Sequence, residues 1–218
     1  MKSLELLLPL TVISVLGAPE PLILQALRFA CIEFCRRTEI VQRLQAPTDV
    51  VAGTQDYAVT VPTDMELVRV LGAAYQGTWL TPVAPDDVRS DTALRGADVG
   101  TAKVLTGAPQ FFFQKQSDLN TISLYPVPGA AVTGGLLVKA AFCPTTTATT
   151  VEDQLIDDWA EGIAAGAVAR VQSLAGQAFS ANPIAARTAF ELAVSSAKRQ
   201  KMVGKQAAAL RVQPRGFA

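Results

Sequence analysis

The side chains best suited to chemistry in this sequence are three cysteines and a cluster of carboxylates, and no histidine accompanies them. Cys31 and Cys35 are four residues apart, so both lie on one face of a helix and could offer two thiolates to a metal. A structural zinc site takes four ligands, and Cys143 is the only other soft donor in the chain. We therefore expect the cysteines to be small buried residues, with no metal site and no disulfide framework.

The carboxylates of Asp157, Asp158 and Glu161 could supply a pair for acid–base catalysis. Acids near the start of a helix more commonly complement the positive end of its dipole. The lack of histidine excludes Ser-His-Asp and Cys-His catalysis, and the sequence contains no phosphate-binding glycine loop, nucleophile elbow or dinucleotide fingerprint. We expect a protein that is not an enzyme and holds no cofactor. An enzyme that uses Asp157 and Glu161 stays open as an alternative.

Two motifs predict close packing, either within the chain or between subunits. Gly162 and Gly166 form a GxxxG pattern in an alanine-rich helix, where the missing side chains let another backbone approach. Phe111 and Phe113 belong to an apolar run with aromatic residues on both faces of one strand, and such strands are buried on both sides. We interpret these four residues as packing residues of the core or of a subunit interface.

Charge is balanced over the 218 residues but separated along the chain. Half of the residues are apolar and 17% are charged, which indicates a folded protein and not a disordered one. The formal net charge is zero, which does not indicate a nucleic-acid binder. Residues 187–218 contain seven cations and one acid, a net charge of +6, so the remainder carries −6. This separation predicts an acidic partner for the C-terminal region, with a solvated basic end as the alternative.

The first residues, MKSLELLLPLTVISVLGAPEP, could be a cleaved secretory leader or the beginning of the fold. Glu5 and Pro9 interrupt the pattern of a leader, and Leu-Gly-Ala at residues 16–18 is a poor cleavage site. An odd number of cysteines also fits a reducing compartment better than export. We expect the segment to be retained and to form a short buried face, which comprises Leu4, Leu7, Leu8, Val12 and Val15.

Helical periodicity occurs at both ends of the chain. Apolar residues recur at helical spacing in residues 19–39, 152–175 and 182–205, and no stretch is long and apolar enough to cross a membrane. Terminal helices that cannot bury their apolar stripes alone must pack together. Residues 210–218 follow the last helix and are expected to be extended.

The middle of the chain has the turn-rich pattern of antiparallel β-structure. Hairpins are predicted for residues 48–61, 67–83 and 110–125 and a strand for 136–142, whereas 85–94 resembles a short helix or turn and 100–109 a loop. The predicted fold is α+β, a helical bundle from the N- and C-terminal segments with an inserted antiparallel β domain, either a small sandwich or a barrel. The predicted domains are an N-terminal helical region (residues 1–46), a β insertion (47–147), C-terminal helices that complete the bundle (148–206) and an extended tail (207–218).

The order of these features resembles the head-to-tail adaptor proteins, also called connector or gatekeeper-ring proteins, of short-tailed bacteriophages. The similarity spans nearly the whole chain and is carried by short stretches in a fixed order. These are Gly17-Ala-Pro-Glu20, Ala26-Leu-Arg-Phe-Ala-Cys-Ile-Glu-Phe-Cys-Arg-Arg-Thr38, Gly53-Thr-Gln-Asp-Tyr57, Gly107-Ala-Pro-Gln-Phe111, Leu124-Tyr-Pro-Val-Pro128, and Ala160-Glu-Gly-Ile-Ala-Ala-Gly-Ala-Val-Ala-Arg170 followed by Phe190.

The resemblance implies a structural virion protein of the neck or tail, which resides in the host cytoplasm during assembly and has no membrane partner. It implies a homo-oligomeric ring, a dodecamer, that joins the portal protein to nozzle or tail-fibre proteins. Genomic DNA would pass through its lumen during ejection without tight binding. Carried over to this chain, the portal-docking residues would be Lys205, Arg211, Arg215 and the apolar anchor Phe217. The alternative is an exported β-sandwich binding protein with a cleaved N-terminal leader.

Overall fold

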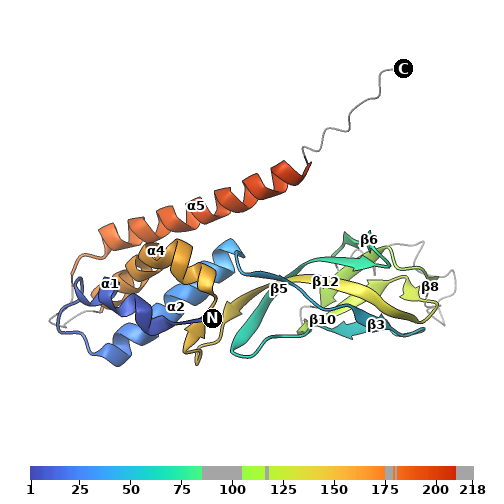
Figure 1. The fold of residues 1–218 in the computed structure, drawn as a ribbon, viewed down its shortest axis with the longest axis horizontal. Coiled ribbons are helices and arrows are strands. Elements are labelled where there is room, and N and C mark those ends of the chain that lie inside the picture. Colours follow the sequence, from blue (N-terminus) through green and yellow to red (C-terminus); the bar gives the residue numbers. More distant parts are fainter. Residues whose placement is uncertain (85–104, 116–117, 175–178, 180, 210–218) are drawn as a thin grey trace, which may run out of the picture. The chain divides into compact units, whose positions relative to one another are not determined.

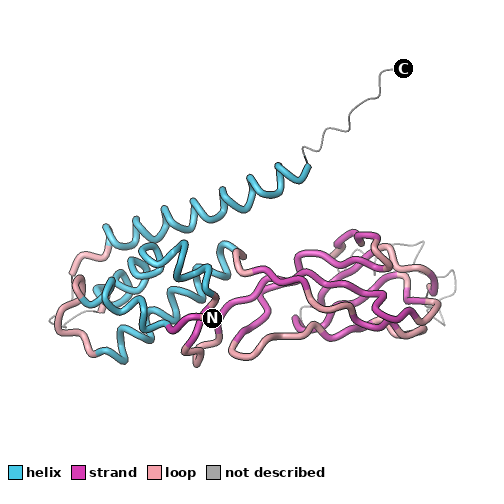
Figure 2. The backbone as a smooth tube through the Cα atoms, in the orientation of Figure 1, coloured by secondary structure: helices cyan, strands magenta, loops and turns pink. Residues whose placement is uncertain are grey.

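The chain divides into two compact units in the computed structural model (Figure 1). A helical unit comprises Met1–Val41 with Cys143–Ala218, and a β unit comprises Gln42–Phe142. The helices belong to the first unit and most strands to the second (Figure 2). The predicted α+β class is therefore confirmed, with β-structure inserted between helical segments. The structure describes residues 1–84, 105–115, 118–174, 179 and 181–209, and in the last helix it describes side chains as far as Met202.

Within the described residues, four helices and one short 3₁₀ helix form the helical unit. α4 is in contact with α1, α2 and α5, and Leu155, Ile163 and Ala167 on its apolar stripe are fully buried. The predicted helices at both ends of the chain thus pack together. Their bounds are η1 Leu4–Leu7, α1 Leu8–Val12, α2 Glu20–Thr38, α4 Asp153–Gln172 and α5 Ile184–Ala209, and two short strands pair beside them, β1 Lys2–Ser3 and β13 Thr150–Val151.

α2 begins and ends for identifiable reasons. Pro21 lies in the first turn, where a missing N–H does no harm, and the carboxylate of Glu20 meets the positive end of the helix dipole. At the other end Glu39 adopts the left-handed conformation, with φ of 50°, and its N–H donates to the carbonyl of Cys35 (2.7 Å). Of the apolar residues at helical spacing in this helix, Leu24 is half-buried and the others are buried, namely Ile23, Leu27, Ala30, Cys31, Phe34 and Cys35.

Only some of the face predicted to be buried in the N-terminal segment is buried. Leu4, Leu7 and Val15 are buried, whereas Leu8 is half-buried and Val12 is 41% exposed. The prediction is wrong at Val12 because the segment is not one continuous helix. The 3₁₀ helix η1 gives way to α1, which ends at Val12, so the apolar residues of the segment point in different directions.

Two larger sheets form the core of the β unit. One has the strand order β2-β12-β5-β6 with β3 also paired to β12, and the other has the order β4-β10-β9-β7. Ile122, Leu124 and Leu136 from these sheets are fully buried, and the N–H of Val70 in β5 donates to the side chain of Gln114 in β9 (2.9 Å). The strands are β2 Gln42–Leu44, β3 Thr48–Val50, β4 Asp56–Ala58, β5 Met65–Tyr75, β6 Thr78–Trp79, β7 Thr81–Pro82, β8 Thr106–Gly107, β9 Phe111–Lys115, β10 Asp118–Tyr125, β11 Val127–Pro128 and β12 Val132–Pro144.

Two of the three predicted hairpins are present. β5 and β6 are joined by a two-residue turn in which Gln76 and Gly77 both have positive φ, the geometry that matches the twist of antiparallel strands. β9 and β10 pair antiparallel with Phe111 opposite Tyr125. The sequence therefore predicts the strand pairs that a short turn connects.

The hairpin predicted for residues 48–61 is wrong. Both strands exist, but β3 pairs with β12 and β4 pairs with β10, so they belong to different sheets. The connection turns at Gly53 (φ 78°), and the hydroxyl of Tyr57 lies within hydrogen-bonding distance of the carbonyl oxygens of Val51 (3.1 Å) and Thr54 (2.9 Å), which stabilises the crossover. Two parallel pairs, β7 with β9 and β8 with β11, depart from the antiparallel prediction, and β8 lies within the predicted loop 100–109. The helix or turn predicted for 85–94 lies outside the described residues.

Candidate functional site

α5, the helix that precedes the C-terminal tail, packs on α4 at the two predicted glycines. A Cβ atom at Gly162 would collide with the Cβ of Ala193, and one at Gly166 would lie 2.5 Å from the ring of Phe190. Glycine is thus needed for the two helices to lie this close. The close approach predicted for Gly162 and Gly166 has its partner in the same chain, and a packing role between subunits stays a prediction.

Phe190 anchors α5 in the helical unit. Its side chain is fully buried, and its ring meets the ring of Phe34 in α2 edge-on, with the centroids 6.2 Å apart. The ring of Phe34 also packs against Trp159 of α4, with the centroids 5.5 Å apart. The three aromatic residues come from three helices, so they join α2, α4 and α5 in one apolar cluster.

A network of ion pairs surrounds this aromatic cluster. The guanidinium of Arg37 donates to both carboxylate oxygens of Glu191 (2.7 and 2.5 Å) and to Glu33 (3.1 Å). Arg170 in α4 also binds Glu33, and the Nε of Arg187 lies 3.5 Å from Glu191. The bidentate geometry between Arg37 and Glu191 is the strong form of such a pair. The network therefore connects the same three helices that share the aromatic cluster.

The arginines keep the carboxylates of this network ionised. Partial burial opposes ionisation of Glu33, but hydrogen bonds from Arg170 and Arg37 outweigh it and hold the pKa of its carboxyl below the ordinary value. The hydrogen bond from Arg37 likewise lowers the pKa of Glu191. The bond to Glu191 in turn raises the pKa of the Arg37 guanidinium. Docking of α5 on α2 is therefore favoured while both carboxylates are charged.

A second ion pair fixes α5 farther along its length. The Nζ of Lys201 lies 2.5 Å from the carboxylate of Glu39 and also donates to the carbonyl of Thr38 (3.4 Å). Both charged side chains are largely covered, with 19% and 15% exposure. A cation at this place complements the negative end of the α2 dipole. Lys201 thus attaches α5 to the C-terminus of α2 shortly before the tail begins.

The predicted portal-docking residues lie at and beyond the end of α5. Lys205 belongs to the helix, and its side chain is not among the described ones. Arg211, Arg215 and Phe217 lie outside the described residues. Their docking role stays a prediction.

The other predicted packing residues belong to the core of the β unit. β9 is an inner strand with β10 on one side and β7 on the other. Phe112 and Phe113 point to opposite faces of this strand and both are buried, while Phe111 is half-buried. Burial on both faces follows the sequence prediction. A contact of Phe111 and Phe113 with another subunit stays a prediction.

The three cysteines are free and buried, as the sequence predicted. Burial raises the pKa of the Cys31 thiol to about 12 and raises the pKa of Cys35 well above its ordinary value. Protonated, buried thiols are poor nucleophiles and poor metal ligands. Within the described residues, the structure contains no cluster of three or more cysteine or carboxylate side chains arranged to hold a metal ion.

The carboxylates weighed for catalysis lie on the surface of α4. Asp157 forms an ion pair with Lys2, and the side chains of Asp158 and Glu161 are exposed. Asp153 in the same turn pairs with the N-terminal amine of Met1 (3.0 Å). The acids near the start of α4 thus hold the N-terminal strand in place, a structural use of these charges.

Residues 6–215 of this chain match the family model of the SU10 adaptor protein. The match takes in the helical unit, the β unit and most of the basic C-terminal region. The chain belongs to the SU10 adaptor protein family. This adaptor is therefore a structural protein of a bacteriophage and a component of the virion neck or tail. A search of curated proteins found no match to the adaptor.

Among the described residues of the adaptor, no helix combines the length and the apolar character needed to span a membrane. The ion pairs between α5 and α2 were not predicted from the sequence. Arg37 with Glu33 and Arg187 with Glu191 are each spaced four residues apart on one helix, a detectable signal for pairing along a helix. That signal does not say which helices meet, so the bridge between Arg37 and Glu191 emerges only from the fold.

Proposed function

We propose that this adaptor is the head-to-tail connector of a short-tailed bacteriophage. Copies of the chain form a dodecameric ring below the portal, extend the channel through which DNA is ejected, and present the β unit to nozzle or tail-fibre proteins. The observation that carries the proposal is the family match over residues 6–215, because it takes in both units and most of the basic tail.

The charge of the tail supports a role in docking on the portal. From Lys205 onward the sequence contains three cations and no acid, and Phe217 supplies an apolar group one residue from the end. Cations attract acidic groups on a partner during encounter, and a buried aromatic side chain can then fix the bound state. Residues 205–218 are therefore the proposed portal-docking segment.

The attachment of α5 supports the same assignment. Phe190, the ion pairs of Glu191 and the contact of Lys201 with Glu39 hold the helix to α2 and α4 before the tail begins. A docking segment carried by an anchored helix loses less conformational freedom on binding than one carried by a free chain. Docking of this segment then fixes where the helical unit lies on the portal.

The charge balance of the adaptor suits a DNA conduit. Each lysine or arginine that contacts a phosphate strengthens binding and makes it depend on salt, so a strongly basic channel would retain the genome. The net charge of this chain is zero. DNA is proposed to pass through the lumen without tight binding.

Two tail variants test this function against the portal protein of the same phage. A chain that ends at Lys205 is expected to fold normally, because the buried residues of α5 that the structure describes end at Ala197, yet to lose portal binding. In the full chain, Arg211→Glu combined with Arg215→Glu should weaken binding about tenfold or more, equivalent to about 1.4 kcal/mol. Arg199→Glu is the matched control, since it reverses an exposed arginine of α5 outside the docking segment.

Affinity is measured by titration of labelled adaptor with portal, and electron microscopy shows the assembly. Unchanged affinity of both tail variants would contradict the docking assignment. A wild-type adaptor that forms no ring, alone or on the portal, would contradict the proposed function itself.

A further inference from the structure

Glu39, the residue at which α2 ends, has a backbone conformation that residues with a side chain seldom adopt. Its φ is 50°, in the left-handed region, and the residue that usually ends a helix in this way is glycine. A side chain at such a position is strained, and the strain persists where the surrounding structure requires that side chain. The end of α2 does not require a carboxylate, so the glutamate needs another explanation.

Two other residues allow a comparison, because they are the remaining non-glycine residues with positive φ among those that the structure describes. Asp64 and Gln76 have φ of 59° and 48°, and both lie in turns of the β unit with exposed side chains. The side chain of Glu39 is only 15% exposed, and its carboxylate lies 2.5 Å from the Nζ of Lys201 in α5. Glu39 therefore differs from the other two residues because its side chain holds a second helix.

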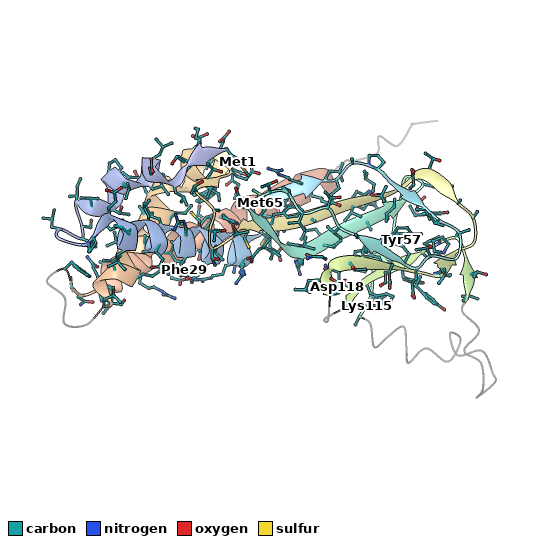
Figure 3. All side chains as sticks on the ribbon, turned by 90° about the horizontal axis from the view of Figure 1, so that it is seen from below. Met1, Phe29, Tyr57, Met65, Lys115 and Asp118 are labelled. Atoms are coloured by element: carbon teal, nitrogen blue, oxygen red, sulfur yellow. The ribbon has the colours of Figure 1, made fainter. Side chains whose placement is uncertain are left out.

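The contact with Glu39 is the last one that the structure describes for α5 before the docking segment. The buried side chains of this helix end at Ala197, and the described side chains, which are drawn in Figure 3, end at Met202. Among the described side chains beyond Ala197, that of Lys201 is the one that bonds another helix, through the carboxylate of Glu39 and the carbonyl of Thr38. Met202, the next residue, is 64% exposed.

This single bond lies where α5 leaves the packed part of the helical unit. From Ala197 the helix continues to Ala209, a length of about 18 Å. A helix without packing is only marginally stable in water, so its turns beyond the core depend on the contacts that remain. The bond between Lys201 and Glu39 fixes the first turn beyond Ala197, and the later turns continue from it.

We propose that Glu39 is a positioning residue for docking on the portal, an inference that rests on the proposed function. Its carboxylate holds Lys201, so that residues 205–218 start from a fixed place on the helical unit. A segment with a fixed start loses less conformational freedom when it binds. The unfavourable backbone conformation of Glu39 is retained for the sake of this bond.

The Glu39→Gly chain separates this role from that of ending a helix. Glycine ends a helix easily in the left-handed conformation, so a glutamate that only ended α2 could be replaced without loss. A positioning role predicts instead that affinity for the portal of the same phage falls about threefold or more, because the docking segment loses its fixed start. Amide hydrogens of residues 198–202 should also exchange faster in the free adaptor, measured by mass spectrometry.

Gln76→Gly is the matched control for this variant. It also replaces a left-handed residue with glycine, but in a turn of the β unit whose side chain is exposed. Portal affinity and the exchange of residues 198–202 should both equal those of the wild type.

A second set of variants tests the same bond from α5. Lys201→Met removes the ammonium group and should weaken portal binding as much as Glu39→Gly does, whereas Lys201→Arg keeps the charge and should retain most of the affinity. Arg199→Met is the matched control, because it removes one cation from an exposed position of the same helix. The chain that combines Glu39→Gly with Lys201→Met should lose no more affinity than either single variant, since both changes break one bond. Additive losses would overturn the inference.

The outcomes separate this inference from the proposed function. If the wild type binds portal and Glu39→Gly binds equally well, the positioning role is overturned and the connector function stands. If amide exchange of residues 198–202 is unchanged in Glu39→Gly, the bond does not order α5, and the inference is overturned whatever the affinity. A wild type that does not bind portal would overturn the proposed function and this inference with it.

Discussion

Gly166 sets how closely α5 can lie against α4. Replacement by alanine would put a Cβ atom 2.5 Å from the ring of Phe190, which is fully buried against Phe34 and has little room to move. Alanine improves helix propensity by about 0.5–1 kcal/mol, but overpacking a filled core costs about 1–3 kcal/mol. We predict that Gly166→Ala lowers the free energy of unfolding by about 1–2 kcal/mol, measured by denaturant titration.

A double variant is the control for this prediction. Phe190→Leu removes some of the ring atoms that the new Cβ atom would meet, so Gly166→Ala should cost less in that background than in the wild type. Such non-additivity is expected for residues in direct contact. Equal costs in both backgrounds would show that α5 moves away from α4 freely, contrary to the packing seen here.

Single residues differ in how far the sequence reveals their role. The burial of the cysteines and the close approach at Gly162 and Gly166 could be predicted from residue type and spacing. A cysteine without further metal ligands nearby is expected to be a buried core residue, and a glycine inside a helix is expected to allow close packing. The pair between Arg37 and Glu191 joins residues 154 positions apart. No local pattern specifies such a partner, because the pairing depends on which helix faces meet.

Among the helices, the attachment of α5 to α2 is expected to depend on pH. The pKa of Glu191 is lowered in the folded state, mainly by the hydrogen bond from Arg37, so its stabilising effect is fully present above the ordinary carboxyl pKa of 4.5. The effect is lost as the pH falls through the lowered pKa. We predict that Glu191→Gln costs about 1 kcal/mol or less at neutral pH, given the partial exposure of this pair, and that the cost shrinks in acid.

Unfolding followed by helical ellipticity at neutral and acidic pH measures this effect. Glu161→Gln is the matched control, because Glu161 is exposed on α4 and forms no ion pair among the described residues. Its cost should be close to zero at both pH values. A cost of Glu191→Gln that stays constant into acid would mean that the ion pair does not stabilise α5.

Helices and strand pairs were predicted correctly where the signal lies within a short stretch of sequence, and incorrectly where a strand pairs with another that is distant in the sequence. The helices follow from apolar residues at helical spacing, and the β5–β6 and β9–β10 hairpins follow from their short turns. β3 and β4 also look like a hairpin, yet each pairs with a strand far away in the sequence. Both strands are three residues long, so their own pattern carries too little information to choose a partner.

On the scale of the whole molecule, each unit has its own core. Ile163 is fully buried in the helical unit, and Ile122 and Leu124 are fully buried in the β unit. A chain whose contacts fall into two such units need not unfold in a single transition. The aromatic residues allow the two units to be followed separately, because Trp159 belongs to the helical unit while Trp79 and all three tyrosines belong to the β unit.

We predict two unfolding transitions that respond to different core substitutions. In a Trp79→Phe background, tryptophan emission reports the helical unit through Trp159, and the near-ultraviolet signal of the tyrosines reports the β unit. Leu124→Ala should destabilise the β unit by about 2–5 kcal/mol and leave the tryptophan transition in place, and Ile163→Ala should do the reverse. Each variant is the control for the other, since both remove a fully buried aliphatic side chain. If either substitution shifted both signals equally, the two units would unfold as one, which would contradict the prediction.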